Sequence, residues 1–395
     1  MKRPSITVVV LLVAFLAGGC DSDSKSSRAQ TGATSTKQGA IQGEPTALCG
    51  TGEDTRPTPA GIAKLDQASG EITGAGSTFV APLMTYWSSE FEKLLGAKVR
   101  YDSVGSGAGV ARISAGDVDF GASEAPMTDA ELSAAKGGAL LHVPLVFGAV
   151  VPAYHLTGQK SGLKFTGELL GKIFAGRITK WNDPELTALN PQANLPADAI
   201  TVVHRSDSSG TTAIFTDYLT KTSPSWVQGL GGQEKSSGRD VPWPVGNVGK
   251  GSEGVSDVLN QTEGALGYVE LTYALSNGLQ VGFVKNRAGR FIQPCVETVT
   301  AAARDLAIPE DLRFDLTDTP GNDAYPISGT TWALVYQHQS DPTRAKTLVN
   351  FLAWVLDDGQ TKARGHNYAP LSPEVRSLAI DQIKKITVDG KPVAQ

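Results

Sequence analysis

Four short stretches of this chain combine Gly with Ser and Thr, the residue types that can surround a small anion. They span residues 74–79, 105–109, 122–126 and 205–212, and three of them open a helix-like pattern. Glycine lets backbone N–H groups crowd around one point, and hydroxyl groups add hydrogen-bond donors without charge. The first turn of a helix leaves further N–H groups unpaired. These features together predict a pocket for a small, dehydrated oxyanion.

The elements that must position these stretches alternate between strand and helix. Apolar runs predict strands at 99–104, 118–122 and 200–204, and helical spacing predicts helices at 82–95, 110–115 and 211–221. This order favours an α/β fold with a parallel sheet, in which ligands bind beyond the carboxyl ends of the strands. The Gly-rich stretches fall at those ends.

Two longer apolar strands are predicted at 145–154 and 330–337, and each is long enough to pass between two domains. We therefore expect a discontinuous first lobe, residues 66–149 plus 327–395, and an inserted second lobe, residues 150–326. Two lobes joined in this way would form a hinge with a central ligand cleft.

The N-terminus has the pattern of a secretory signal. Lys2 and Arg3 precede an apolar run over residues 6–16, which is too short to span a bilayer. Small residues then lead to Cys20, an arrangement that resembles a bacterial lipobox. We expect a lipoprotein signal peptide at 1–19 and a lipid on Cys20. An ordinary signal peptide with an incidental cysteine is the alternative.

The segment that follows, residues 20–65, is expected to be a flexible tether. Ser, Thr, Gly, Gln, Lys and Asp dominate residues 21–43, and such a composition buries too little apolar surface to fold. The globular part would then be held, by the lipid alone, at the outer face of the cell membrane.

Composition narrows the function classes further. A formal net charge of −5 argues against nucleic-acid binding. The five histidines show no metal-ligand spacing, so we expect no metal site and no cofactor. Setting Cys20 aside, Cys49 and Cys295 are an even number in an oxidising compartment. They form either a disulfide or two unrelated free thiols.

Six motifs occur in the order seen in a known family. They are TGAGSTF (73–79), GSGAG (105–109), DFGAS (119–123), IFAGRITKWN (173–182), RSDSSGT (205–211) and GALGYVE (264–270). The chain thus resembles the phosphate-binding component of bacterial phosphate-specific ABC transporters. The resemblance runs from about residue 72 to 368 and implies a type II periplasmic binding protein fold.

The resemblance implies a set of ligand contacts. Hydroxyl or N–H donors would come from Thr78, Phe79, Ser106, Ser209, Gly210 and Thr211, and a forked cationic donor from Arg205. Asp207 would hold the Arg205 guanidinium in place without touching the ligand. Glu124 would accept a hydrogen bond from the ligand, although the family usually has Asp at this position.

The function implied is high-affinity binding of inorganic phosphate. The protein would act as a monomer and pass phosphate to the permease subunits of an ABC importer that has a cytoplasmic ATPase. Two alternatives are a binding protein for another oxyanion, such as sulfate or molybdate, and a phosphatase or other hydrolase on the same scaffold. We expect no enzyme, because the sequence lacks a Gly-x-Ser-x-Gly elbow and an acidic metal cluster.

Overall fold

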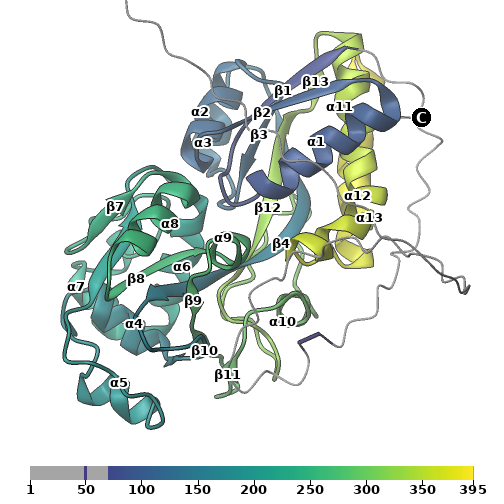
Figure 1. Cartoon of the computed structure of the whole chain (residues 1–395). Coiled ribbons are helices and arrows are strands. Elements are labelled where there is room, and N and C mark those ends of the chain that lie inside the picture. The colour runs from purple at the N-terminus through teal and green to yellow at the C-terminus, as the bar shows by residue number, and fades with distance from the viewer. Residues whose placement is uncertain (1–48, 51–69, 395) are drawn as a thin grey trace, which may run out of the picture. The chain divides into compact units, whose positions relative to one another are not determined.

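The computed structural model describes residues 49–50 and 70–394. Within them, nine strands form a sheet in the order β2-β1-β3-β12-β4-β8-β6-β7, with β9 paired to β4 (Figure 1). The strands of this sheet are β1 Glu71–Gly76, β2 Lys98–Ser103, β3 Phe120–Ser123, β4 Leu140–His155, β6 Thr201–Arg205, β7 Asn247–Gly249, β8 Ala265–Glu270, β9 Gln280–Val281 and β12 Ser328–Tyr336.

Strand β4 runs through both halves of the sheet (Figure 1). Its residues 140–149 pair antiparallel with β12, and residues 150–155 pair antiparallel with β8. The first half of the sheet thus contains the mutually parallel β1, β2 and β3, and the second half contains the mutually parallel β6, β7 and β8. The change of partner after Ala149 coincides with the predicted lobe boundary, while the division into lobes remains a prediction.

Helices cover both faces of the first half, and the alternation of β12 explains why. Trp332, Leu334 and Tyr336 pack in a cluster with α2, whereas Ala333 and Val335 face the larger core that contains α1 and α11. Successive strand residues point to opposite faces, so a strand that is apolar throughout needs a cover on each side. Figure 1 shows α2 and α1 on different sides of these strands.

The longer helices carry the apolar spacing expected of half-buried helices. In α1, Leu83, Met84, Trp87 and Phe91 are all fully buried. The longer helices are α1 Ala81–Leu95, α2 Ser106–Ala115, α6 Gly210–Thr222, α8 Gly251–Gln261, α11 Pro342–Val355 and α13 Pro373–Lys384. The shorter ones are α3 Asp129–Ala134, α4 Gly167–Phe174, α5 Pro184–Leu189, α7 Pro224–Gly229, α9 Leu271–Ser276, α10 Val296–Ala302 and α12 Asp358–Ala363, with 3₁₀ turns η1 Gln233–Lys235 and η2 Arg364–His366.

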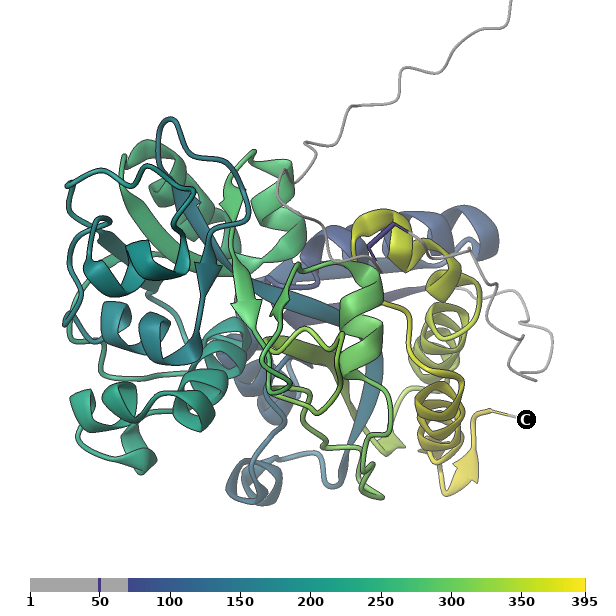
Figure 2. The ribbon, with the colours of Figure 1, turned by 90° about the horizontal axis from the view of Figure 1, so that it is seen from below.

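Two small three-stranded sheets complete the described part. Their strands are β5 Lys164–Phe165, β10 Phe283–Lys285 and β11 Phe291–Ile292 in one, and β13 His338–Gln339, β14 Thr387–Val388 and β15 Lys391–Pro392 in the other. Helix α10 packs against β4, and Figure 2 shows it in green in front of that strand.

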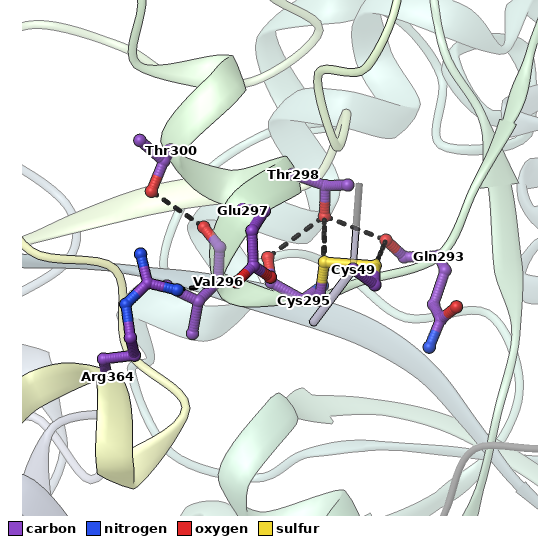
Figure 3. The surroundings of a disulfide bond; sticks show 8 residues. All are labelled: Cys49, Gln293, Cys295, Val296, Glu297, Thr298, Thr300 and Arg364. Carbon is purple, nitrogen blue, oxygen red and sulfur yellow. Dashed lines mark hydrogen bonds and ion pairs between the residues drawn. A yellow bond between two sulfur atoms is a disulfide. The ribbon is translucent and has the colours of Figure 1, made fainter. Parts of the chain in front are cut away.

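Cys49 and Cys295 form a disulfide at the start of α10 (Figure 3). Of the two arrangements open from the sequence, the structure therefore has the bridge rather than free thiols. The bridge joins residues 246 positions apart. The first turn of α10 also carries Glu297, which pairs with Arg364 of η2 at 2.6 Å. Both sulfurs are engaged, so Cys49, Cys295 and Glu297 offer no thiolate to a metal, although they lie at ligand spacing.

Two sequence expectations need correction. Strand β12 does not cross between the halves, because its partners are β3 and residues 140–149 of β4 only. Helix α2 begins at Ser106, four residues before the expected 110–115. The signal peptide, Cys20 and the tether lie outside the described residues. In the described part, no helix combines the length and the apolar character needed to span a membrane.

Candidate functional site

Every predicted site residue lies at the carboxyl end of a parallel strand or just beyond it. The turn 77–80 joins β1 to α1, Ser106 opens α2 after β2, and Glu124 follows β3 directly. In the second half, Arg205 is the last residue of β6, and residues 206–209 lead to α6. Parallel strands end at one edge of a sheet, so this arrangement gathers the residues at that edge.

Glu124 is the buried acid of the site, and neutral hydroxyl groups hold it. Ser77 donates to its Oε1, as does Thr331 at 2.9 Å, and Ser106 donates to its Oε2 at 3.0 Å. Each carboxylate oxygen can accept two hydrogen bonds. Among the described residues, Oε1 therefore has both acceptor positions filled, whereas Oε2 has one position left.

Gly210, the first residue of α6, lies against this carboxylate. A Cβ placed on Gly210 would lie 2.5 Å from Glu124 Oε2 and 2.6 Å from Ser106 Oγ. Only glycine permits this approach, which brings the N-terminus of a 13-residue helix to the open side of Oε2. The structure thus unites Glu124, Ser106 and Gly210 from three separate motifs.

Arg205 supplies the cation, and Asp207 fixes its orientation. The Arg205 Nε donates to Asp207 Oδ1 at 2.8 Å, and Nη2 donates to Oδ2 at 2.5 Å. The two side chains are only 2% and 14% exposed, which distinguishes this forked pair from a surface ion pair. The remaining Nη1 donates to Thr211 Oγ1 at 3.3 Å, so the guanidinium also reaches the first turn of α6.

Asp207 also connects the pair to other Gly-rich turns. Its Oδ1 accepts the N–H of Gly251 at 2.9 Å, and a Cβ on Gly105 would lie 2.4 Å from its Oδ2. The adjacent Ser208 carbonyl accepts the N–H of Gly107 at 3.0 Å. Glycines in the 105–109 stretch therefore allow the turn before α6 to pack directly on the start of α2.

Ser209 caps α6, and its hydroxyl keeps a proton for another partner. The Oγ of Ser209 accepts the N–H of Thr212 at 3.1 Å, which satisfies one of the unpaired donors of the first turn. A hydroxyl group that accepts in this way can still donate its own proton. Ser209, Gly210 and Thr211 thus form one donor group at a helix N-terminus.

Thr78 and Phe79 occupy the turn that opens α1. The Oγ of Ser252 lies 2.9 Å from Thr78 Oγ1, and the N–H of Ser252 donates to the same oxygen at 3.2 Å. The ring of Phe79 is fully buried and packs edge-on against Tyr368. Thr78 therefore contacts the second half of the sheet, whereas the Phe79 side chain serves the core.

Comparisons with known proteins assign this chain to a family. The sequence matches the PBP superfamily domain over residues 61–359. It is 40% identical over 308 residues to the phosphate-binding protein PstS of Xylella fastidiosa, covering 77% of this chain and 82% of that protein. It is also 40% identical over 316 residues to PstS of Haemophilus influenzae, covering 79% and 92%. The chain belongs to the PstS family.

Solved structures agree with this assignment at the level of the fold. A phosphate-binding protein from Stenotrophomonas maltophilia superposes with a TM-score of 0.63 at 20% identity, covering 79% of this chain and 93% of that one. A high-affinity periplasmic phosphate-binding protein solved with bound phosphate gives a TM-score of 0.62 at 22% identity, covering 78% and 92%. These neighbours confirm the expected α/β fold of a periplasmic binding protein.

The pKa values of the two acids of the candidate site shift in opposite directions. Burial raises the pKa of Glu124, although the Ser77, Thr331 and Ser106 hydroxyls and the charge of Arg205 act against that rise. Burial alone would also raise the pKa of Asp207, but the hydrogen bonds and charge of Arg205 lower it on balance. Asp207 is therefore a fixed anion paired to Arg205.

Several residues of the candidate site were not predicted from the sequence. Ser77 and Thr331 bind Glu124, Ser252 binds Thr78, and the Tyr268 hydroxyl accepts from Arg205 N at 3.2 Å. One local signal existed for Ser252, because the GKGS run at 249–252 follows the short strand β7 and opens α8 as the other stretches do. Thr331 lies within an apolar strand and gave no such signal.

Proposed function

We propose that this protein binds inorganic phosphate at the edge shared by the two sheet halves and delivers it to an ABC importer. One observation carries the proposal: the open acceptor position on Glu124 Oε2 lies beside the N-terminus of α6, which the Arg205 guanidinium also contacts. Donors and a cation suit an oxyanion, and a free acceptor suits an oxyanion that carries a proton. Phosphate has both properties near neutral pH.

Each site residue has a role in this proposal. Thr78, Phe79 and Ser106 would donate from the first half of the sheet, and Ser209, Gly210 and Thr211 would donate from α6. Arg205 would give the forked cationic contact while Asp207 holds it in place. The Ser106 hydroxyl, which donates to Glu124 Oε2, would turn to donate to the ligand while a phosphate O–H donates to Oε2.

Contacts between the halves support closure around the ligand. Thr78 bonds to Ser252, Gly107 donates to Ser208, and Arg239 pairs with Glu131. Each contact joins the predicted first lobe, residues 66–149 and 327–395, to the predicted second lobe, residues 150–326. Opening about β4 would break all of them, and rebinding of phosphate would restore them.

The relatives extend the proposal to partners and location. The names of the relatives describe phosphate-binding proteins rather than enzymes, which disfavours the phosphatase alternative. We infer that the protein works as a monomer outside the cytoplasmic membrane, held by a lipid on Cys20. It would pass phosphate to the permease subunits of an importer driven by a cytoplasmic ATPase.

Calorimetric titration with phosphate, sulfate and arsenate tests the binding function. Phosphate and arsenate should bind, because both carry a proton that Glu124 can accept, and sulfate should not compete at millimolar concentration. Tight sulfate or molybdate binding with no phosphate heat would instead support the alternative oxyanion, and turnover of a phosphate ester would support the hydrolase.

Labelling with a radioactive fatty acid tests the anchor. Wild-type protein should take up label and partition with membranes, whereas Cys20→Ala should take up none and still bind phosphate. Unlabelled wild-type protein would contradict the lipid anchor and leave phosphate binding untouched.

A further inference from the structure

Three consecutive backbone carbonyls of the turn that opens α1 accept hydrogen bonds from three tyrosine hydroxyls. Tyr101 Oη donates to the carbonyl of Ser77 at 2.8 Å. Tyr273 Oη donates to that of Thr78 at 2.8 Å, and Tyr368 Oη donates to that of Phe79 at 2.6 Å. The tyrosines come from three places, namely β2, α9 and the segment after η2.

The position of the turn explains why these carbonyls need partners. Residues 77–79 lie between β1 and α1, so their carbonyls lie outside the strand ladder and the helix. The Thr78 carbonyl also accepts a long hydrogen bond from the Ala81 N–H, at 3.4 Å. Ser77, Thr78 and Phe79 are 0%, 6% and 0% exposed, so water does not serve them. A buried carbonyl without a partner costs about 1–3 kcal/mol, and the tyrosines remove that cost.

Fixing these carbonyls also fixes the neighbouring N–H groups. In a planar trans peptide, the C=O of one residue and the N–H of the next point in opposite directions. The carbonyls of Ser77 and Thr78 therefore set the direction of the N–H groups of Thr78 and Phe79. Those are the backbone donors of the proposed phosphate site.

We propose that Tyr101 and Tyr273 are positioning residues that orient the Thr78 and Phe79 N–H groups toward phosphate. Tyr368 holds the end of the same turn through the next peptide, which carries the Val80 N–H. This inference rests on the proposed function and assigns the site a supporting layer. The hydroxyls bind the carbonyl side of the turn, and in this proposal they do not contact the ligand.

The ionisation of the three side chains agrees with a donor role. Burial raises the pKa of Tyr101, Tyr273 and Tyr368 above that of free tyrosine. Each hydroxyl therefore keeps its proton throughout the physiological range and remains available to donate.

The three tyrosines differ in which lobe they belong to. Tyr101 and Tyr368 lie in the predicted first lobe together with the turn, so their bonds persist when the lobes part. Tyr273 lies in the predicted second lobe, so its bond to Thr78 forms only on closure. Tyr273 would therefore hold the closed state, whereas the other two would prepare the turn in both states.

The test compares Tyr→Phe variants of the full-length protein in detergent by titration with inorganic phosphate. Tyr101→Phe and Tyr273→Phe should each raise the Kd for phosphate about tenfold, since one bond to a buried carbonyl is lost. Tyr368→Phe should have a smaller effect, because its carbonyl partner fixes the Val80 N–H and not a ligand donor. Tyr154→Phe is the matched control, because its buried hydroxyl donates to the Lys160 carbonyl at 2.6 Å on the other half. That control should leave the Kd unchanged.

Amide NMR supplies a readout that a loss of packing alone would not move. Phosphate should shift the Thr78 and Phe79 amide protons downfield in the wild type, and Tyr101→Phe and Tyr273→Phe should each reduce that shift. Unchanged amide shifts, or a Kd no higher than that of Tyr154→Phe, would overturn the inference while phosphate binding stands. Absence of phosphate binding by the wild type would overturn the proposed function itself. Tyr101 is only partly buried, so its variant keeps the test decisive if the other two fold poorly.

Discussion

The two halves of the sheet stabilise their buried site acids in different ways. In the first half, Glu124 accepts from three neutral hydroxyls and burial raises its pKa. In the second half, Asp207 forms a fork with Arg205, and its pKa is lowered on balance. The Arg205 charge is thus matched by a nearby anion, whereas the side-chain hydrogen bonds to Glu124 all come from neutral hydroxyl groups. The first arrangement suits proton-dependent recognition, and the second suits attraction to any anion.

Removing Arg205 should produce the largest change in the Kd for phosphate, because it removes the cation of the site. Arg205→Ala should raise the Kd for phosphate by at least about 10³-fold, since a dehydrated anion loses a forked cationic donor. Calorimetry measures the effect, and a melting curve checks folding, because Asp207 is left without its partner. Arg100→Ala, at an exposed pair with Glu71, is the matched control. A change within about twofold for Arg205→Ala would show that the site lies elsewhere.

Changing Glu124 should alter selectivity more than affinity. The wild type should prefer phosphate to sulfate by about 10³-fold, because a carboxylate facing a bare sulfate oxygen repels it. In Glu124→Gln the amide can turn to donate, so the preference should fall to about tenfold. Competition titrations measure the ratio.

A control carboxylate for Glu124 exists in α4. Glu168 also accepts from serine hydroxyls, those of Ser223 and Ser225, but it lies outside the site. Glu168→Gln should leave the phosphate preference unchanged. Strong sulfate competition in the wild type would contradict the proposed role of Glu124.

Asp207 should matter less than Arg205, because it acts through that residue. Asp207→Asn keeps one acceptor for the guanidinium but loses the fork, and the Kd for phosphate should rise about tenfold. Titration of single and double variants measures the coupling. The Asp207→Asn change should have little further effect once Arg205 is Ala. Equal and additive losses would instead place Asp207 in direct contact with the ligand.

The sequence predicted the parts of the site that local signals encode. Gly and Ser at strand ends mark turns and helix starts, and the two-residue spacing of Arg205 and Asp207 permits a fork. The GKGS run marked Ser252 only as part of a turn before a helix, and Thr331 had no local signal. Their contacts with Thr78 and Glu124 could not be predicted, because the paired residues are 174 and 207 positions apart. Only the tertiary fold creates those pairs.

The early start of α2 has a similar cause. Glycines lower helix propensity, so residues 105–109 favoured a turn with the helix after it. In the structure Gly107 and Gly109 lie within the helix, and glycine is needed at both positions because neighbours approach closely. A Cβ on Gly109 would lie 2.6 Å from the Gly76 Cα, and one on Gly107 would lie 2.3 Å from the Ser208 Cβ. Likewise, the apolar pattern of β12 predicted a strand but could not show that its partners all belong to one half.

Glu270 offers the smallest but sharpest test of the contrast, because it is a dipole-solvated acid in the second half of the sheet. It is fully buried at the end of β8 and accepts from the Thr272 N–H and hydroxyl and from Tyr368. Burial raises its pKa to about 8, as it raises that of Glu124. The direction of the pKa shift would then depend on whether the acid pairs with a charged group or with neutral dipoles, and not on the half of the sheet in which it lies.

The stability of the protein should report this shift. Between about pH 6.5 and 8, the folded protein holds a proton on Glu270 that the unfolded chain has released, so stability should fall as pH rises, by up to about 1.4 kcal/mol per pH unit. His142, with a pKa lowered to about 4, gives the opposite slope only below 6.5. The titratable neighbours Tyr273 and Tyr368 have raised pKa values and stay protonated. Denaturant unfolding across this window should therefore show a smaller pH slope for Glu270→Gln than for the wild type. Identical slopes would mean that Glu270 is ionised in the folded protein at neutral pH, and the contrast between dipole-solvated and ion-paired acids would fail in this half.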